Sequence, residues 1–561
     1  MDENKISTLP HWPLLAAFCG LLGAALFAFL WGHPTGARRL PLPPQPKGDI
    51  ILGNLSEVIA ASKESMQHLL MHRWAHEHGE VFRVRLGPVT EYFLNSDRAV
   101  KEIMDRSSAI SSERPRWIVS NELICNQLNV LLLHGSDPRW KTQRRVINTY
   151  LTSVPRADAG LPFLHYETAR FLHDIANTPD ASLDGTWILR SIGRYTYSAF
   201  ATQTFGMDMI PSLTTFMKRV SRRSWAQSQE CMVDIFTWLN HLPLSLKPWE
   251  RDARRRFQRD MKWCLARLQK LKDPAFAGEY MADAFLPSVL RAPDCGGLTA
   301  KQKRHTWPFS LLSVLPTRKY QSQISTWSFL EAMLQYPDVQ RKARAEIEAV
   351  VGGRLPEFAD LERIPYVRCV MKETWRWRPP VSLGHPHVTT KDIVYNGQRI
   401  PKGARLHLNA WAISHDPKRH DDPDRFWPER YADNHTATMQ SINSPDVTKR
   451  DHFAFGAGRR VCPGYHVAER SLAITVMRIL WACEIKWARG TRAPVDPLTY
   501  TRRSEMPGNP SSRLPVTLRV LSQEKADIIN RTFEALQRER APIFVLIELI
   551  SHLSGNEQLA W

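Results

Sequence analysis

One short segment near the C-terminus places a single cysteine in a turn rich in glycine and arginine. It reads Phe453-Ala-Phe-Gly-Ala-Gly-Arg-Arg-Val-Cys-Pro-Gly464 and leads into a helical run that begins at Tyr465. Its glycines allow the backbone to approach a flat ligand, and the start of the following helix favours a thiolate over a thiol. An ordinary glycine loop around a buried cysteine would not need the whole pattern. That pattern comprises Phe455, Gly458, Arg460, Cys462 and Gly464. The segment predicts a cysteine thiolate that ligates iron.

The other cysteines and the charge balance exclude several classes of protein. Eight cysteines lie far apart, with no C-x-x-C pair and no zinc-ligand spacing, so neither a disulfide framework nor a zinc site is expected. The chain has 75 basic and 56 acidic residues, a formal charge of +19. Such a surplus suits nucleic acid, an anionic membrane surface or an acidic protein partner. No zinc-finger, RNP or basic-helix signature accompanies it, so we expect no nucleic-acid partner.

The N-terminus contains an apolar run that is long enough for a membrane anchor. Leu14 to Trp31 has no charged residue, and at 1.5 Å per residue it crosses most of a hydrocarbon core of ~30 Å. A cleaved signal peptide is the alternative, although its apolar region would normally be shorter. Positive charge follows the run at Arg38, Arg39 and Lys47, which predicts that the following domain faces the cytosol. We expect residues 1–40 to form a single transmembrane anchor and the proline-rich residues 41–55 to form a hinge.

The rest of the chain is predicted to be one large, mainly helical domain with a small β region. Residues 56–536 contain no linker or repeat, and apolar residues recur at helical spacing over 336–351. Residues 81–86 alternate as a strand does, and residues 393–400 resemble a hairpin that turns at Asn396-Gly397. Residues 537–561 contain an apolar stretch too short to span a bilayer, and we assign them to a C-terminal extension.

Two further motifs occur in the order typical of one family. Glu373-Thr-Trp-Arg376 precedes the cysteine by about ninety residues, and Arg430 follows in Trp427-Pro-Glu-Arg-Tyr431. With the cysteine loop, these segments resemble the cytochrome P450 family over about residues 41–532. The resemblance implies the P450 fold and a structural triad of Glu373, Arg376 and Arg430 that holds the core.

The same resemblance implies the residues that bind haem b. Trp140 and Arg144 look like the family's W-x-x-x-R helix, on one helical face and directed at a propionate. Arg460 is suited to a propionate as well, and His387 follows the proline-rich run after the E-x-x-R segment. The resemblance makes Cys462 the axial ligand, with Phe455, Gly458 and Gly464 shaping its loop.

The family's chemistry is the insertion of one oxygen atom from O2 into an unreactive bond of a small lipophilic substrate. No nicotinamide fingerprint is evident, so the resemblance implies electrons from NADPH through a separate NADPH-cytochrome reductase. We expect a monomer in the endoplasmic reticulum membrane with its catalytic domain in the cytosol. The run Pro380 to His387 and the hinge resemble fungal members of secondary metabolism.

One segment departs from the family. An acid and a threonine that relay protons are expected in a helix before the E-x-x-R segment, but neither forms the expected pattern within residues 304–323. Pro308 and Pro316 stand where this long helix should run, and each costs about 3 kcal/mol in a helix interior. One explanation is translation out of frame, since shifted codons for residues 313–320 can encode Ser-Ala-Ala-Asp-Thr-Lys-Val. If the sequence is real, the alternatives are a peroxide-using or rearranging haem-thiolate enzyme, or an inactive membrane-tethered haem protein.

Overall fold

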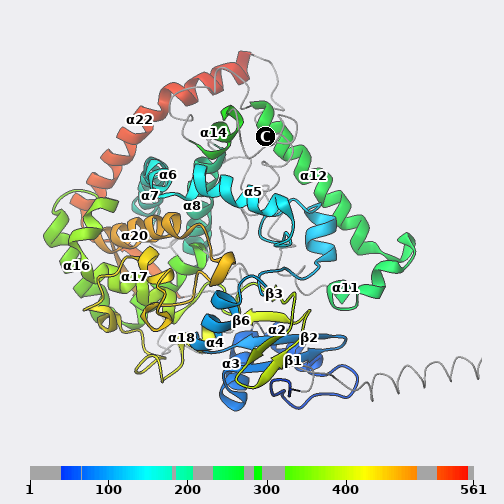
Figure 1. Cartoon of the computed structure of the whole chain (residues 1–561). Helices are drawn as coiled ribbons and strands as arrows, with labels where there is room; N and C mark the ends of the chain where they lie inside the picture. Colours follow the sequence, from blue (N-terminus) through cyan, green and yellow to red (C-terminus); the bar gives the residue numbers. More distant parts are fainter. Residues whose placement is uncertain are drawn as a thin grey trace, which may run out of the picture.

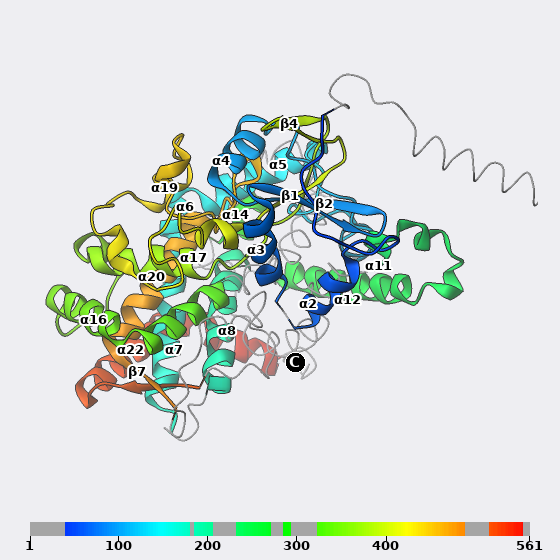
Figure 2. The same ribbon diagram turned by 90° about the horizontal axis from the view of Figure 1, so that it is seen from below.

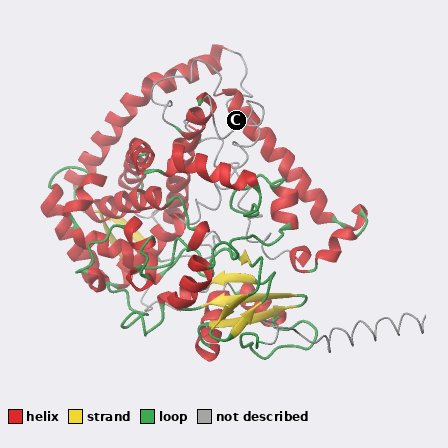
Figure 3. Cartoon of the chain, in the orientation of Figure 1, coloured by secondary structure: helices red, strands yellow, loops and turns green. Residues whose placement is uncertain are grey.

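Helices make up most of the molecule, and a small sheet lies at one edge. The computed structural model describes residues 40–64, 66–179, 185–205, 232–270, 284–292, 322–488 and 515–553. Figure 1 shows the sheet below the helical body, and Figure 3 shows how the strands gather there. The predicted fold class, mainly α with a small β region, is therefore confirmed.

The helices, helical turns and strands are named here by type, each type in chain order. The longer helices are α2 (Leu55–Lys63), α3 (Gln67–His78), α5 (Pro138–Ile147), α7 (Leu161–Ala176), α8 (Gly185–Phe205), α12 (Pro248–Lys270), α16 (Pro337–Val351), α17 (Pro365–Trp377), α20 (Tyr465–Ala482) and α22 (Gln523–Leu553). The short helices are α4 (Asp97–Val100), α6 (Val154–Ala159), α11 (Met232–Ile235), α14 (Phe285–Arg291), α18 (Ala410–Ser414) and α19 (Thr438–Ile442). Helical turns are η2 (Lys101–Arg106), η3 (Ile118–Ile124), η4 (Asn148–Thr152), η6 (Thr237–His241), η7 (Leu244–Leu246), η9 (Phe358–Arg363), η10 (Pro428–Tyr431), η11 (Val447–Lys449) and η12 (Gly458–Arg460). The strands are β1 (Val81–Leu86), β2 (Val89–Leu94), β3 (His387–Val388), β4 (Ile393–Tyr395), β5 (Gln398–Ile400), β6 (Arg405–Leu408), β7 (Cys483–Trp487) and β8 (Val516–Val520). Residues 322–335 are helical as well.

Helix α16 shows how the sequence encodes these elements. It begins with Pro337, whose missing N–H costs nothing in a first helical turn, and it ends before Gly352 at φ +60°. Val339, Ala343 and Ile347 recur at helical spacing and are buried. The predicted helix over 336–351 is confirmed within one residue.

The main sheet joins segments that lie far apart in the sequence. Its strand order is β1-β2-β6-β3. Strands β1 and β2 form an antiparallel hairpin, whereas β2 and β6 pair in parallel, with Glu91 opposite Arg405. Strand β3 pairs with β6, which places His387 opposite Leu406. The sheet therefore fixes His387 beside elements from the first hundred residues.

The predicted strand over 81–86 is β1, and the predicted hairpin over 393–400 is β4 with β5. Its turn residues Asn396 and Gly397 have φ of +48° and +73°, as a two-residue hairpin turn requires.

The largest apolar core surrounds helix α20, which directly follows the cysteine loop. Helices α7, α16 and α17 all pack against it, as Figure 2 shows from below. Its buried side chains point in every direction around its axis. They include Leu472, Ile474, Val476, Met477, Leu480 and Trp481. A helix that is buried on all sides has neighbours in every direction, so α20 is a rigid base for the loop before it.

The expected hinge lies against the sheet. Residues 41–48 are extended, as their prolines require, but Arg83 donates its backbone N–H to the Pro44 carbonyl and its Nε to the Pro43 carbonyl (2.9 and 3.0 Å). Arg399 donates its backbone N–H to Pro41 in the same way (2.8 Å). These bonds join the segment to β1 and β5, because edge strands have N–H groups that need acceptors.

One helix spans the expected boundary between residues 536 and 537. Helix α22 runs without a break from Gln523 to Leu553. Its Phe533 packs on Tyr166 and His173 of α7, with ring centroids 5.7 and 4.6 Å apart. The second half of this helix therefore continues a helix that belongs to the body.

Two of the expected segments lie wholly or largely outside the described residues. The expected membrane anchor, residues 1–40, is described only at residue 40, and the departing segment 304–323 is described only at 322 and 323. Within the described part of the chain, no helix is both long enough and apolar enough to cross a bilayer.

Candidate active site

The loop that carries Cys462 is closed by its own backbone. Cys462 donates its N–H to the Phe455 carbonyl (2.9 Å), and Gly464 directs its N–H at the Cys462 sulfur (3.4 Å). Helix α20 begins at the next residue, so its N-terminus lies beside the sulfur. Both the N–H group and the helix terminus favour negative charge on sulfur.

Two glycines of this loop have left-handed backbones for different reasons. Gly458 has φ +67°, and an added Cβ would overlap the Met104 carbonyl. Its N–H binds the Asp105 carboxylate (3.0 Å), so this glycine packs the loop against η2. Gly456 has φ +76°, lines a cavity and has nothing within 4 Å of an added Cβ. Gly456 therefore leaves room for a flat group close to the backbone.

Arg460 points from the loop into the interior. Its Nε donates to the Ser112 carbonyl (3.0 Å) and its Nη2 to the Leu133 carbonyl (2.7 Å). Its Nη1 is buried and has no hydrogen-bond partner among the described residues. Burial lowers the pKa of Arg460 to about 10, partly offset by Glu113. A buried cation with a free donor is suited to bind an anionic group.

Trp140 and Arg144 reach the same place from helix α5. Asp137 caps this helix by accepting from the Arg139 N–H (2.8 Å), and the helix begins at Pro138. The Trp140 ring lies under the Arg460 guanidinium, 4.2 Å from its centroid. Arg144 donates to the Val461 carbonyl, next to Cys462. Burial lowers the pKa of Arg144, while a Cys462 thiolate would raise it.

His387 lines the cavity from strand β3, and its Nδ1 lies 2.9 Å from the Ser111 carbonyl. Burial, reinforced by Arg114, holds the pKa of His387 well below its usual range, so the ring is neutral without an anion nearby.

Arg114 is a cavity residue that the sequence analysis missed. It donates to the carbonyls of Leu131 (2.9 Å) and Pro386 (2.7 Å) and is buried. Burial, together with Arg460 and Arg144, lowers its pKa strongly. No local motif marks it, because its partners come from segments 17 and 272 residues away.

The cavity itself tests whether these residues fit haem. Cys462, Gly456 and three arginines line it together with two histidines, and no carboxylate does so among the described residues. The remaining lining is largely apolar and includes Met104, Val130, Leu131, Ile147, Phe200, Val381 and Leu408. Haem is a flat apolar ring with an iron atom and two carboxylates. The thiolate suits the iron, the clustered cations with an unpartnered donor suit the carboxylates, and the open space at Gly456 suits the ring.

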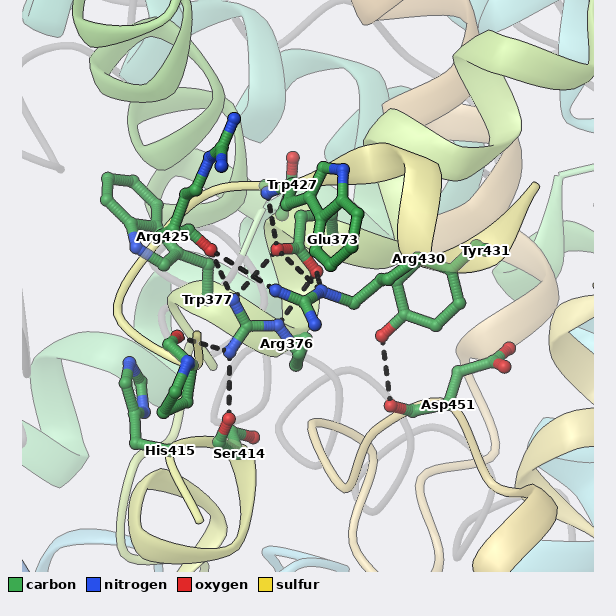
Figure 4. A network of polar contacts seen from close by, with 12 residues as sticks. Glu373, Arg376, Trp377, Ser414, His415, Arg425, Trp427, Arg430, Tyr431 and Asp451 are labelled. Atoms are coloured by element: carbon green, nitrogen blue, oxygen red, sulfur yellow. Dashed lines mark hydrogen bonds and ion pairs between the residues drawn. The ribbon is translucent and has the colours of Figure 1, made fainter. Parts of the chain in front are cut away.

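The expected triad forms a buried network on helix α17 (Figure 4). Glu373 accepts two bonds from Arg376 (2.7 and 2.8 Å), and the Arg430 Nε–H is shared between its two carboxylate oxygens (both 3.1 Å). The Trp427 N–H also donates to it (2.8 Å). Arg376 further donates to the carbonyls of Ser414 and Pro423. Both carboxylate oxygens accept hydrogen bonds, so the network fixes α17 to η10, which carries Arg430.

The helix over residues 322–335 contributes hydroxyl groups to the cavity. Ser322, Ser325 and Thr326 line it. The acid and threonine expected within 304–323 are not among the described residues, since residues 304–321 lie outside them.

Comparison with known proteins identifies the family. The model of the family described as "Cytochrome P450" matches residues 43–500. A cytochrome P450 monooxygenase of Gibberella fujikuroi is 51% identical over 519 residues, which cover 90% of this chain and 94% of the relative. The cytochrome P450 monooxygenase virE of Hypocrea virens is 34% identical over 475 residues, or 82% of each chain. A solved zebrafish cytochrome P450 with abiraterone has a TM-score of 0.60 at 21% identity and covers 81% of this chain and 100% of its own, which supports the fold alone. The chain belongs to the cytochrome P450 family, and it is a haem-thiolate monooxygenase.

Proposed function

We propose that this monooxygenase inserts one oxygen atom of O2 into a small lipophilic substrate of fungal secondary metabolism. The observation that carries the proposal is a single cavity that contains both Cys462 and the three arginines Arg114, Arg144 and Arg460, with a largely apolar remaining lining. A bound haem with thiolate ligation supplies oxygen activation. The apolar lining favours a lipophilic substrate and excludes water. Loading the reconstituted enzyme with candidate terpenoid, polyketide and aromatic substrates, and finding one hydroxylated or epoxidised product per NADPH, would support it.

The residues assigned to haem b have distinct roles in this proposal. In this proposal Cys462 would hold the haem iron and Arg144, Arg460 and His387 would bind the propionates; we add Arg114 to this set because it lines the same cavity. Trp140 stacks on Arg460 and orients its guanidinium. Phe455, Gly458 and Gly464 shape the loop, and Glu373, Arg376 and Arg430 hold the core without touching the reacting atoms. A pyridine haemochrome spectrum of another haem type would contradict the cofactor assignment.

Electrons are proposed to come from NADPH through a separate reductase. A surface depression beside Cys462 is lined by Lys141, Arg144, Arg145 and Tyr465, with no carboxylate among the described lining residues. Lys141 and Arg145 are exposed, so this surface is suited to an acidic partner. Lys141→Glu with Arg145→Glu should raise the reductase concentration needed for half-maximal rate, most strongly at low salt, and leave peroxide-driven turnover unchanged. Equal salt dependence in wild type and variant would contradict this.

We also propose a single-pass anchor in the endoplasmic reticulum membrane, with the catalytic domain in the cytosol. The uncharged run at residues 14–31 supports it, and the exposed Ile50, Ile51 and Leu52 follow closely in the sequence. Full-length protein should float with lipid vesicles and resist extraction by alkaline carbonate. Release of the full-length chain by carbonate would refute the anchor.

A second candidate function follows from residues 304–323, whose sequence lacks the expected pattern of an acid followed by a threonine. Without that relay, the candidate reaction is the use of a peroxide, or the rearrangement of an oxygenated substrate, at the same haem-thiolate site. Turnover with NADPH and reductase, compared with turnover by peroxide alone, separates these candidates. Transcript sequencing tests the reading frame: an unbroken message without compensating shifts between Lys303 and Ser325 would refute the frameshift.

A further inference from the structure

Helix α17 carries two buried tryptophans with different surroundings. The Glu373 network fixes this helix on one side. Trp377 donates its indole N–H to the Asp424 carbonyl (2.8 Å) and belongs to the apolar core. Trp375 lines the cavity that also contains Cys462. An indole N–H can only donate, so a buried tryptophan requires an acceptor at a fixed place.

Trp375 contacts the loop that carries Cys462. Its ring lies edge-on to Phe455, with centroids 5.1 Å apart at 72°, and edge-on to His452, at 5.4 Å and 61°. Phe455 is the residue whose carbonyl accepts the Cys462 N–H. The indole ring therefore supports the loop at the residue that also holds the cysteine backbone.

Trp375 also contacts the helix over residues 322–335. Its Nε1 donates to Ser325 Oγ (3.3 Å), and both residues are buried. Ser322, Ser325 and Thr326 are spaced three and four residues apart, so they share one helical face, and all three line the cavity. Gln323 donates to the Leu189 carbonyl of α8 (2.8 Å). Trp375 and α8 thus hold this part of the helix from two directions.

We propose that Trp375 is a positioning residue, which sets the hydroxyl-bearing face of residues 322–335 relative to the loop that carries Cys462. The inference rests on the proposed O2-dependent reaction and goes beyond it by assigning this residue. The physical basis is that the Trp375 side chain contacts two walls of the cavity at once, the loop at Phe455 and the helix at Ser325. The Glu373 network holds α17, which carries Trp375, in place. Proton transfer depends steeply on the separation of donor and acceptor, so loss of this link should impair proton delivery more than it impairs folding.

The test removes the indole-to-hydroxyl bond from each side. Trp375→Phe keeps an aromatic ring against Phe455 but loses the N–H, and Ser325→Ala loses the acceptor. Trp377→Phe is the control on the same helix, because it removes the part-buried indole bond to the Asp424 carbonyl, and Trp377 is not among the described residues that line the cavity. The holoenzyme with NADPH, reductase and substrate is assayed for hydrogen peroxide per NADPH oxidised, the route by which O2 takes two electrons and two protons without product. The C–O stretching band of the reduced, CO-bound protein gives a second readout that needs no turnover.

Both cavity variants should raise the ratio of peroxide to product about fivefold, the factor expected for the loss of one buried hydrogen bond worth about 1 kcal/mol. The double variant should show no larger effect than the Trp375→Phe variant, since both changes remove the same hydrogen bond. The C–O band should shift or broaden in both cavity variants and stay unchanged in Trp377→Phe.

Equal behaviour of Trp375→Phe and Trp377→Phe in both readouts would overturn the proposal, as would additive effects of Trp375→Phe and Ser325→Ala. If Trp375→Phe does not fold, an unchanged ratio and band in Ser325→Ala would overturn it. A wild-type enzyme without NADPH-dependent turnover would instead refute the proposed function, and the C–O band would still test the positioning role.

Discussion

Substitutions of Gly456 and Gly458 can distinguish a glycine that leaves room for haem from a glycine that packs the loop against its neighbour. Both have positive φ, +76° and +67°, so alanine at either position costs about 1–2 kcal/mol of backbone strain. At Gly458 the new methyl group would also overlap the Met104 carbonyl, so the backbone of the loop or of η2 would have to move. At Gly456 the methyl group meets no atom within 4 Å and enters the cavity.

Gly456→Ala should therefore fold and lose haem, whereas Gly458→Ala should fold poorly. For Gly456→Ala we expect a loss of about 1–2 kcal/mol in unfolding free energy from strain alone, with wild-type helix content. Its haem content should fall and its haem should transfer faster to an acceptor protein, because the methyl group occupies the space next to the flat ring. Gly458→Ala should lose several kcal/mol, as overlap adds to strain.

The assay combines circular dichroism during thermal unfolding with the ratio of haem to protein absorbance and the rate of haem transfer. Wild-type haem retention in Gly456→Ala would refute the assignment of this glycine to the cradle. Equal loss of helix content in the two variants would show that Gly456 serves packing alone.

Three further predictions concern Cys462, Glu373 and Asp234. Cys462→Ala should abolish the red-shifted band of the reduced protein with carbon monoxide, and survival of that band would exclude Cys462 as the ligand. Glu373→Gln leaves Arg376 and Arg430 without their shared buried carboxylate and should cost about 3–5 kcal/mol in denaturant unfolding; a loss below about 1 kcal/mol would contradict the network. Asp234 is buried and accepts hydrogen bonds from the backbone of η3, and burial raises its pKa to about 6. Because the folded protein therefore binds more protons at this site than the unfolded chain does, the unfolding free energy falls as the pH rises from about 4 to 6. Asp234→Asn should thus stabilise by at most about 3 kcal/mol above pH 7 and by much less below pH 4, and a stabilisation independent of pH would refute this origin.

The local motifs could be read from the sequence because their residues are close together. The cysteine loop occupies twelve consecutive residues that lead into a helix, so its glycines, arginine and thiol can be recognised together as an iron-binding loop without knowledge of the tertiary contacts. Glu373 and Arg376 are one helical turn apart, and Trp140 and Arg144 share a face of α5. The helix over 337–351 and the Asn396-Gly397 hairpin follow from periodicity and turn chemistry.

Tertiary structure alone decided which distant groups meet. Arg114 reaches the cavity through carbonyls of residues 131, 385 and 386, and Trp375 joins Phe455 to Ser325 across three segments. Nothing in the neighbouring sequence marks either residue, because a buried arginine or tryptophan is defined by its acceptors. Helix α22 likewise continues past Ala535 and through Pro542, where local sequence would favour an interruption, so its full length did not follow from the sequence. The sequence by itself therefore determined the ligand loop, the family and the separate motifs. The shape of the cavity and the residues that connect its walls depended on contacts between segments hundreds of residues apart, which no local pattern encodes.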